Sequence, residues 1–79
     1  MNAMKMELLE RIYSIAVQND SMNFIELDEN FYKFGDLFNI QYLDEKELIC
    51  VDAEEYHGVP TLVSLTVEAI DLVESRFEE

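Results

Sequence analysis

The chain has 79 residues, of which 18 are Asp or Glu and 5 are Lys or Arg, so its formal net charge is −13. This balance argues against nucleic acid or an anionic membrane surface as a partner, because both are recognised through clusters of basic side chains. With 49% hydrophobic residues, the chain can still fold. Its length predicts a single domain over residues 1–79, built as a small all-α antiparallel bundle.

Residues 4–18 have the periodicity of an amphipathic helix. Leu8, Ile12 and Ile15 recur at helical spacing, and charged side chains take the other side. The polar run 19–21 marks the end of this helix. Residues 1–19 carry no net charge, so the whole excess of −13 lies in residues 20–79.

Residues 20–43 form a long segment that is rich in aromatic and aliphatic side chains. We expect an ordered loop packed across the bundle, and ordered loops of this length are often functional. Asp28-Glu29-Asn30 lacks the ligand spacing of a calcium loop. The sequence therefore predicts no metal site.

A second helix is predicted to begin at Asp44, as its N-cap, and to stop at Gly58. His57 is interpreted as a structural residue at the end of this helix. Cys50, the only cysteine, lies in an apolar run, which predicts a buried thiol. A single cysteine fits a reducing compartment, and the chain has no apolar run that could span a bilayer, so we expect a cytoplasmic protein.

The third predicted helix runs from Thr66, a candidate N-cap, to Phe77. Val67, Ile70 and Val73 share one face of it. The preceding apolar residues are expected to enter the core as a short turn or a residual helix; they are Leu62, Val63 and Leu65.

The order of these segments resembles the acyl carrier protein family. The likeness is carried by residues 25–35, 43–49 and 66–73 and covers nearly the whole chain. It implies three main helices, a long ordered first loop and a shortened or missing third helix. Members of this family carry a phosphopantetheine arm on the serine of an Asp-Ser-Leu motif at the start of the second helix. The alignment places Tyr42 at that serine position, and Ser64 is the alternative attachment residue in a rival register.

The resemblance and the charge together predict a non-catalytic protein without a cofactor. It would bind partners that have a basic patch, such as biosynthetic enzymes, through an acidic second helix. The expected contact residues are Asp44, Glu45, Glu47, Asp52, Glu54 and Glu55. Two alternatives stay open: a functional acyl carrier protein of fatty-acid or polyketide-type biosynthesis that carries phosphopantetheine, and an acidic inhibitor or immunity-type protein.

Overall fold

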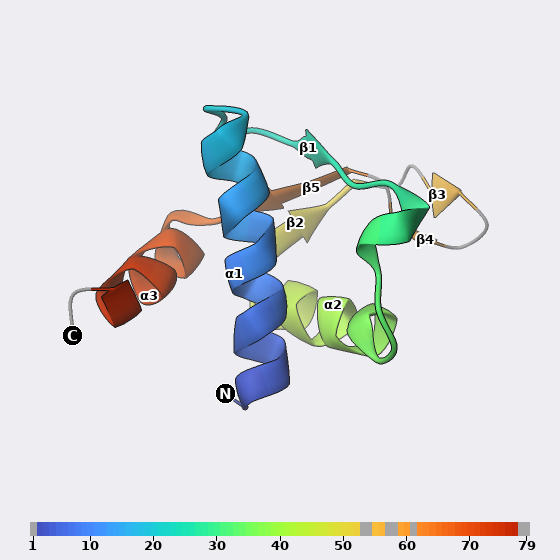
Figure 1. Ribbon diagram of the computed structural model, residues 1–79, viewed down its shortest axis with the longest axis horizontal. Coiled ribbons are helices and arrows are strands. Elements are labelled where there is room, and N and C mark those ends of the chain that lie inside the picture. The colour runs from blue at the N-terminus through green and yellow to red at the C-terminus, as the bar shows by residue number, and fades with distance from the viewer. Residues whose placement is uncertain (1, 53–54, 57–58, 61, 78–79) are drawn as a thin grey trace.

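The fold is mixed α/β, with three helices and an antiparallel sheet (Figure 1). The computed structural model describes residues 2–52, 55–56, 59–60 and 62–77. The all-α prediction is therefore wrong. In chain order the elements are α1 (Ala3–Gln18), β1 (Ile25–Glu26), the 3₁₀ helix η1 (Glu29–Phe31), α2 (Asp36–Glu45), β2 (Ile49–Val51), β3 (Glu55–Tyr56), β4 (Val59–Pro60), β5 (Leu62–Leu65) and α3 (Val67–Phe77).

The main sheet has the strand order β1-β5-β2, so the last strand lies in the centre. β5 is antiparallel to both neighbours, and Val63 stands opposite Ile25 on one side and Val51 on the other. Val63 and Leu65 are buried whereas Ser64 is half-buried, which is the alternation of a strand with one covered face. The turn or residual helix expected here is wrong. β3 and β4 pair separately as a short antiparallel hairpin.

The first predicted helix is confirmed as α1. Leu8, Leu9 and Ile12 are completely buried, as their spacing indicated. The Asn2 side chain caps the helix by accepting a hydrogen bond from the Lys5 amide at 3.0 Å. α1 crosses the sheet and contacts β5, while α2 and α3 pack against its two sides (Figure 1).

The second helix is not where the sequence predicted it. α2 begins after Gly35, whose φ of +85° suits a residue without a side chain. Ile40 and Leu43 face the core. Asp44, the expected N-cap, lies in the last turn of α2, and the segment expected to continue as a helix contains β2 and the β3–β4 hairpin instead.

The third predicted helix is confirmed as α3, with Thr66 as its N-cap. The Thr66 hydroxyl accepts a hydrogen bond from the Ala69 amide at 3.2 Å. The same hydroxyl and the Thr66 amide both donate to the Leu48 carbonyl, each at 3.1 Å. The start of α3 is thereby attached to the residue that precedes β2.

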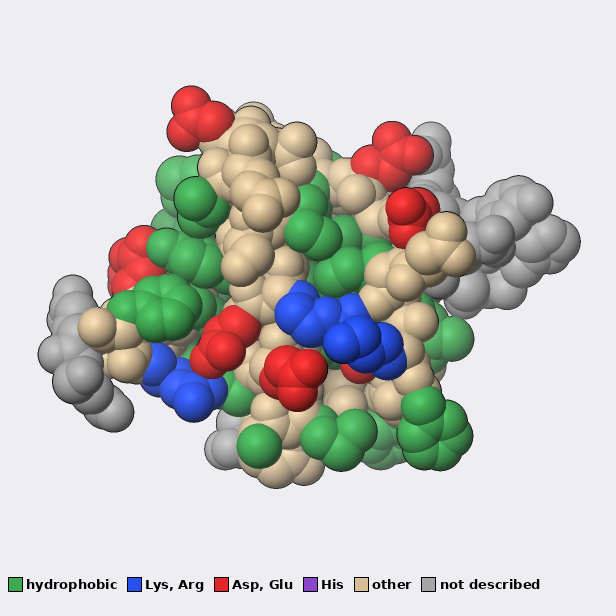
Figure 2. Space-filling model, in the orientation of Figure 1, with side chains coloured by type: hydrophobic (Ala, Val, Ile, Leu, Met, Phe, Trp, Pro, Cys, Tyr) green, Lys and Arg blue, Asp and Glu red, His purple; other side chains and the backbone are tan. Residues whose placement is uncertain are grey.

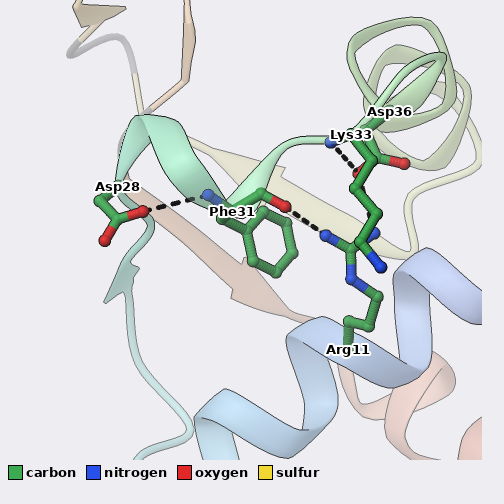
Figure 3. A network of polar contacts seen from close by, with 5 residues as sticks. All are labelled: Arg11, Asp28, Phe31, Lys33 and Asp36. Carbon is green, nitrogen blue, oxygen red and sulfur yellow. Dashed lines mark hydrogen bonds and ion pairs between the residues drawn. The ribbon is translucent and has the colours of Figure 1, made fainter.

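A polar cluster joins α1, η1 and α2 on one side of the core (Figure 3). The Arg11 guanidinium forms an ion pair with Asp36 at 2.8 Å, donates to the Phe31 carbonyl and lies 4.4 Å from the centre of the Phe31 ring. Asp36 also accepts a hydrogen bond from the Lys33 amide at 2.8 Å. Asp28 caps η1 by accepting from the Phe31 amide at 3.0 Å. We call the contacts among these residues the Arg11 clamp.

The Tyr32 side chain gives folding a dependence on pH in the alkaline range. Its hydroxyl donates to the Pro60 carbonyl at 2.7 Å, and burial, with a smaller effect of the Asp36 carboxylate, raises the pKa of Tyr32 from 10.0 to about 12. Between these values the folded state keeps a proton that the unfolded chain has lost. The stabilisation is therefore complete below about pH 10 and is lost as the pH rises towards 12.

We expect the difference in unfolding free energy between the wild type and Tyr32→Phe to be constant below pH 10 and to shrink above it. Urea titrations at a series of pH values measure this difference. If the two proteins lost stability in parallel up to pH 12, Tyr32 would not be the responsible group.

Within the part of the chain that the structure describes, no helix is both long enough and apolar enough to cross a membrane.

Candidate protein-binding groove

An open groove lies between the C-terminal half of α1 and α3. Its volume is about 270 Å³, slightly below the range of about 300–1,000 Å³ that is usual for small-molecule sites. Figure 2 shows hydrophobic side chains between these helices, with acidic side chains beside them. We call it the α1–α3 groove, and its lining residues are Tyr13, Ala16, Val17, Asp20, Ser21, Met22, Leu65, Ile70 and Glu74.

The end of α1 places one carboxylate at the groove. Asp20 has a φ of +50°, and the Asp20 and Ser21 amides donate to the Val17 and Ala16 carbonyls, each at 3.0 Å. This is a Schellman motif, which commonly has glycine at the position that Asp20 occupies. The backbone thus fixes Asp20 just beyond the helix, with its side chain exposed.

A second carboxylate comes from α3. Glu74 accepts a hydrogen bond from the Tyr13 hydroxyl at 2.7 Å, and this bond, with smaller effects of desolvation and of the Glu74 charge, raises the pKa of Tyr13. The Tyr13 ring also contacts Phe77, with centroids 6.1 Å apart. Arg76 forms an ion pair with Glu10 at 2.7 Å, so α3 is tied to α1 beside the groove.

The groove combines an apolar lining with a negative potential. Val17 and Met22 are 59% and 64% exposed, so apolar surface is available to a ligand. None of the lining residues is basic, and the last turn of α1 carries no basic residue that would offset the negative end of the helix. The site therefore suits a ligand that presents an apolar group next to a cation.

Comparisons with known proteins do not assign this groove. No family model matches the chain, and no curated protein or solved structure matches it significantly.

The two candidate attachment residues lie in unrelated places. Tyr42 is a half-buried residue within α2, not at the start of a helix, and its ring lies 4.8 Å from the Lys5 ammonium and 5.7 Å from that of Lys46. Ser64 lies in the central strand opposite Cys50. Neither residue occupies the helix start at which the carrier resemblance places its attachment serine.

The acidic residues predicted to form one helical face do not share a helix. Asp44 and Glu45 are exposed in the last turn of α2, Glu47 follows in a left-handed conformation with a φ of +59°, and Asp52 comes after β2, where its amide donates to the Leu62 carbonyl at 2.9 Å. The prediction that they form one face of a second helix is therefore wrong, and their role in partner binding stays a prediction. Three predicted positions lie outside the described residues: Glu54, His57 and Gly58. The side chain of Glu55 is not described.

Two further predictions concern single side chains. Cys50 is exposed, so the prediction of a buried thiol is wrong: it points away from the core because Ile49, its neighbour in the strand, points into it. Among the residues that the structure describes, no group of three His, Cys, Asp or Glu side chains could hold a metal ion.

Sequence reasoning missed the groove residues because their meeting depends on tertiary structure. Tyr13 and Glu74 are 61 positions apart, and the helical spacing of Tyr13 with Leu9 and Ala16 predicts only an apolar face of the first helix. The sequence indicates Asp20 only as part of the polar run 19–21 that ends the first helix. The sequence holds one signal for the position of Glu74. α3 carries acidic residues at intervals that place Glu74 close to the apolar face formed by Ile70 and Val73.

Proposed function

We propose that this protein is a non-catalytic binding domain that holds a basic, amphipathic segment of a partner protein in the α1–α3 groove. The observation that carries the proposal is the pairing of exposed apolar side chains with two carboxylates, Asp20 and Glu74, at a site with no basic lining residue. An amphipathic helix with Leu or Ile on one face and Lys or Arg beside it matches both features. The net charge of −13 would also steer such a partner towards the domain.

The charge on α2 supports a protein partner over DNA. A helix that reads DNA lies in the major groove, between two phosphate backbones. α2 has no Lys or Arg and carries Asp36, Asp44 and Glu45. Such a helix would be repelled by the phosphate backbone.

The proposal keeps the basic partner that the sequence predicted and moves its contact site. The expected contacts between residues 44 and 55 are replaced by a groove formed by α1 and α3, which lie far apart in the sequence and side by side in the fold (Figure 1). The proposed binding requires neither phosphopantetheine nor any other cofactor.

A synthetic amphipathic peptide of Leu and Lys tests the proposal, at a length of about 15 residues so that it can form a helix. We expect saturable binding that weakens with added salt, and no binding of the peptide in which every Lys is replaced by Glu. Each exposed carboxylate contributes about 0.2–1 kcal/mol. Asp20→Asn or Glu74→Gln should thus raise the dissociation constant by up to about fivefold.

Two glycine substitutions form a matched pair that separates binding from stability. Asp20 and Glu47 both occupy the left-handed position of a Schellman motif, but only Asp20 lines the groove. Asp20→Gly and Glu47→Gly should each stabilise the fold by about 1 kcal/mol, because glycine removes the left-handed strain. Only Asp20→Gly should weaken peptide binding, as measured by fluorescence titration of a labelled peptide.

If both substitutions weakened peptide binding equally, the peptide would be responding to the net charge of the protein alone. The α1–α3 groove would then not be its binding site. Unchanged binding in Val17→Ser, a substitution at an exposed position, would likewise count against the apolar part of the site. If the acidic peptide bound as well as the basic one, the proposed class of partner would be wrong.

A further inference from the structure

The α1–α3 groove has a corner made of two aromatic rings and a carboxylate. Glu74 and Phe77 are three residues apart in α3, so their side chains are neighbours on the helix surface. Tyr13 reaches both of them from α1: its hydroxyl donates to Oε2 of Glu74 at 2.7 Å, and its ring centre lies 6.1 Å from that of Phe77. We call these three residues the Tyr13 corner.

The Tyr13 corner is accessible to a ligand. Tyr13 and Glu74 line the groove, and Phe77 is 65% exposed. The two rings are inclined at 49° to each other, so neither ring covers the whole face of the other. Because the Tyr13 hydroxyl contacts Oε2, the second oxygen of Glu74, Oε1, has no hydrogen-bond or ion-pair partner among the described residues. The corner therefore presents an available carboxylate oxygen beside aromatic surface.

The Arg11 clamp shows which cation suits a ring and a carboxylate together. Its guanidinium pairs with Asp36 at 2.8 Å and lies 4.4 Å from the centre of the Phe31 ring. A guanidinium can make both contacts at once, because its donors lie in its plane and its flat face stacks on the ring. An ammonium has no flat face: Lys5 lies 4.8 Å from the centre of the Tyr42 ring and has no ion pair among the described residues.

A guanidinium of the chain itself lies near the Tyr13 corner and is already engaged. Arg76 precedes Phe77 in α3, and it pairs with Glu10 at 2.7 Å. Glu10 is three residues before Tyr13, about one turn away along α1. The pair holds Arg76 at Glu10, so Arg76 does not occupy the corner, and its charge is compensated where it would otherwise repel an incoming cation.

We propose that the Tyr13 corner receives an arginine side chain of the basic partner, in preference to a lysine. The guanidinium lies against the aromatic rings and donates to Oε1 of Glu74. The Tyr13 hydroxyl holds Oε2 and so keeps the carboxylate in place for this contact. The inference rests on the proposed function, because it names the cation that the α1–α3 groove selects. It changes neither the apolar part of the partner nor the role of Asp20.

Two peptides test the preference: the peptide of Leu and Lys, and its counterpart in which every Lys is replaced by Arg. Fluorescence titration gives both dissociation constants, and for the wild type we expect the Arg peptide to bind about two- to fivefold more tightly. Phe77→Leu removes the ring and keeps an apolar side chain, so the two constants should become nearly equal. Phe38→Leu is the matched control, because Phe38 is 71% exposed on α2, and it should leave their ratio unchanged. Glu74→Gln should also lower the ratio, and thermal melts verify the fold of each variant.

Equal binding of the two peptides by the wild type would overturn the inference. If that binding were still weakened by Asp20→Gly and not by Glu47→Gly, the proposed function would stand without it. A preference for the Arg peptide that persisted in Phe77→Leu would also overturn the inference, because the Tyr13 corner would not be its source. If neither peptide bound, the groove would not be a site for a basic partner, and both proposals would fail together.

Discussion

Asp36→Ala is expected to lower the free energy of unfolding by about 3–5 kcal/mol, the usual loss when one partner of a buried ion pair is removed. The Asp36 side chain is only 7% exposed, and the Arg11 side chain is 22% exposed. Without the carboxylate, the Arg11 guanidinium would keep the Phe31 carbonyl but lose its counter-charge, and the Lys33 amide would lose its acceptor. Because small domains have a total stability of about 5–15 kcal/mol, this loss should be visible as a large decrease in the urea midpoint.

Asp36→Asn separates the charge from the hydrogen bonds of the Arg11 clamp. The amide oxygen can still accept from the Lys33 amide and from Arg11, so this variant should lose clearly less stability than Asp36→Ala. Circular dichroism during urea titration measures both variants. A loss below about 1 kcal/mol in Asp36→Ala, within the range of exposed pairs, would show that the clamp is not a principal support of the fold.

Leu43→Ala is expected to cost about 2–5 kcal/mol, the range found when a fully buried leucine is reduced to alanine. Leu43 is completely buried and faces the core from the last turn of α2. The substitution removes apolar contact area and leaves a cavity that the surrounding side chains fill only in part. The thermal midpoint and the urea midpoint should both decrease.

Leu37→Ala is the control for this substitution, because it makes the same chemical change in the same helix. Leu37 is 39% exposed, so its replacement should cost less than about 1 kcal/mol. Equal losses at the two positions would mean that α2 does not present the face to the core that its burial pattern indicates.

The helices α1 and α3 could be predicted because their signals are local and sufficient. Each combines a side-chain cap, Asn2 or Thr66, with apolar positions at helical spacing over eleven residues or more. A helix of this kind buries one face against whatever lies next to it. Its bounds are set by its own caps and spacing, whereas its stability comes from packing that face.

The central part of the chain could not be predicted because its signals are short and ambiguous. Asp44 and Glu47 have the spacing of a helix start, but in the structure they end one helix: the Glu47 amide donates to the Asp44 carbonyl at 3.0 Å. β2 and β5 have three and four residues, and an apolar run of that length fits a buried turn, a helix or a strand equally well. Only the pairing of β5 with β1 and β2 makes these runs strands, and this pairing joins residues that are far apart in the sequence.

The same limit applies to function. The prediction of a basic partner rests on the net charge of −13, and the composition alone is enough to give it. The position of the proposed binding site does not follow from the composition, because the Tyr13–Glu74 contact joins residues from the two ends of the chain. One of the three segments that carry the carrier resemblance is interpreted from the sequence as a helix start at Asp44, where the structure has the last turn of α2 instead; the resemblance itself stays a prediction.

Thr66 connects α3 to the segment that leads into β2. Its side chain caps α3 and, together with its amide, donates to the Leu48 carbonyl, so detaching α3 breaks the first contact of the helix and its link to the segment before β2 in one event. We therefore infer that α3 and the sheet unfold as one cooperative unit. On this inference the α3 wall of the α1–α3 groove opens only together with the sheet, so the proposed ligand would meet a preformed surface and would not have to order it on binding.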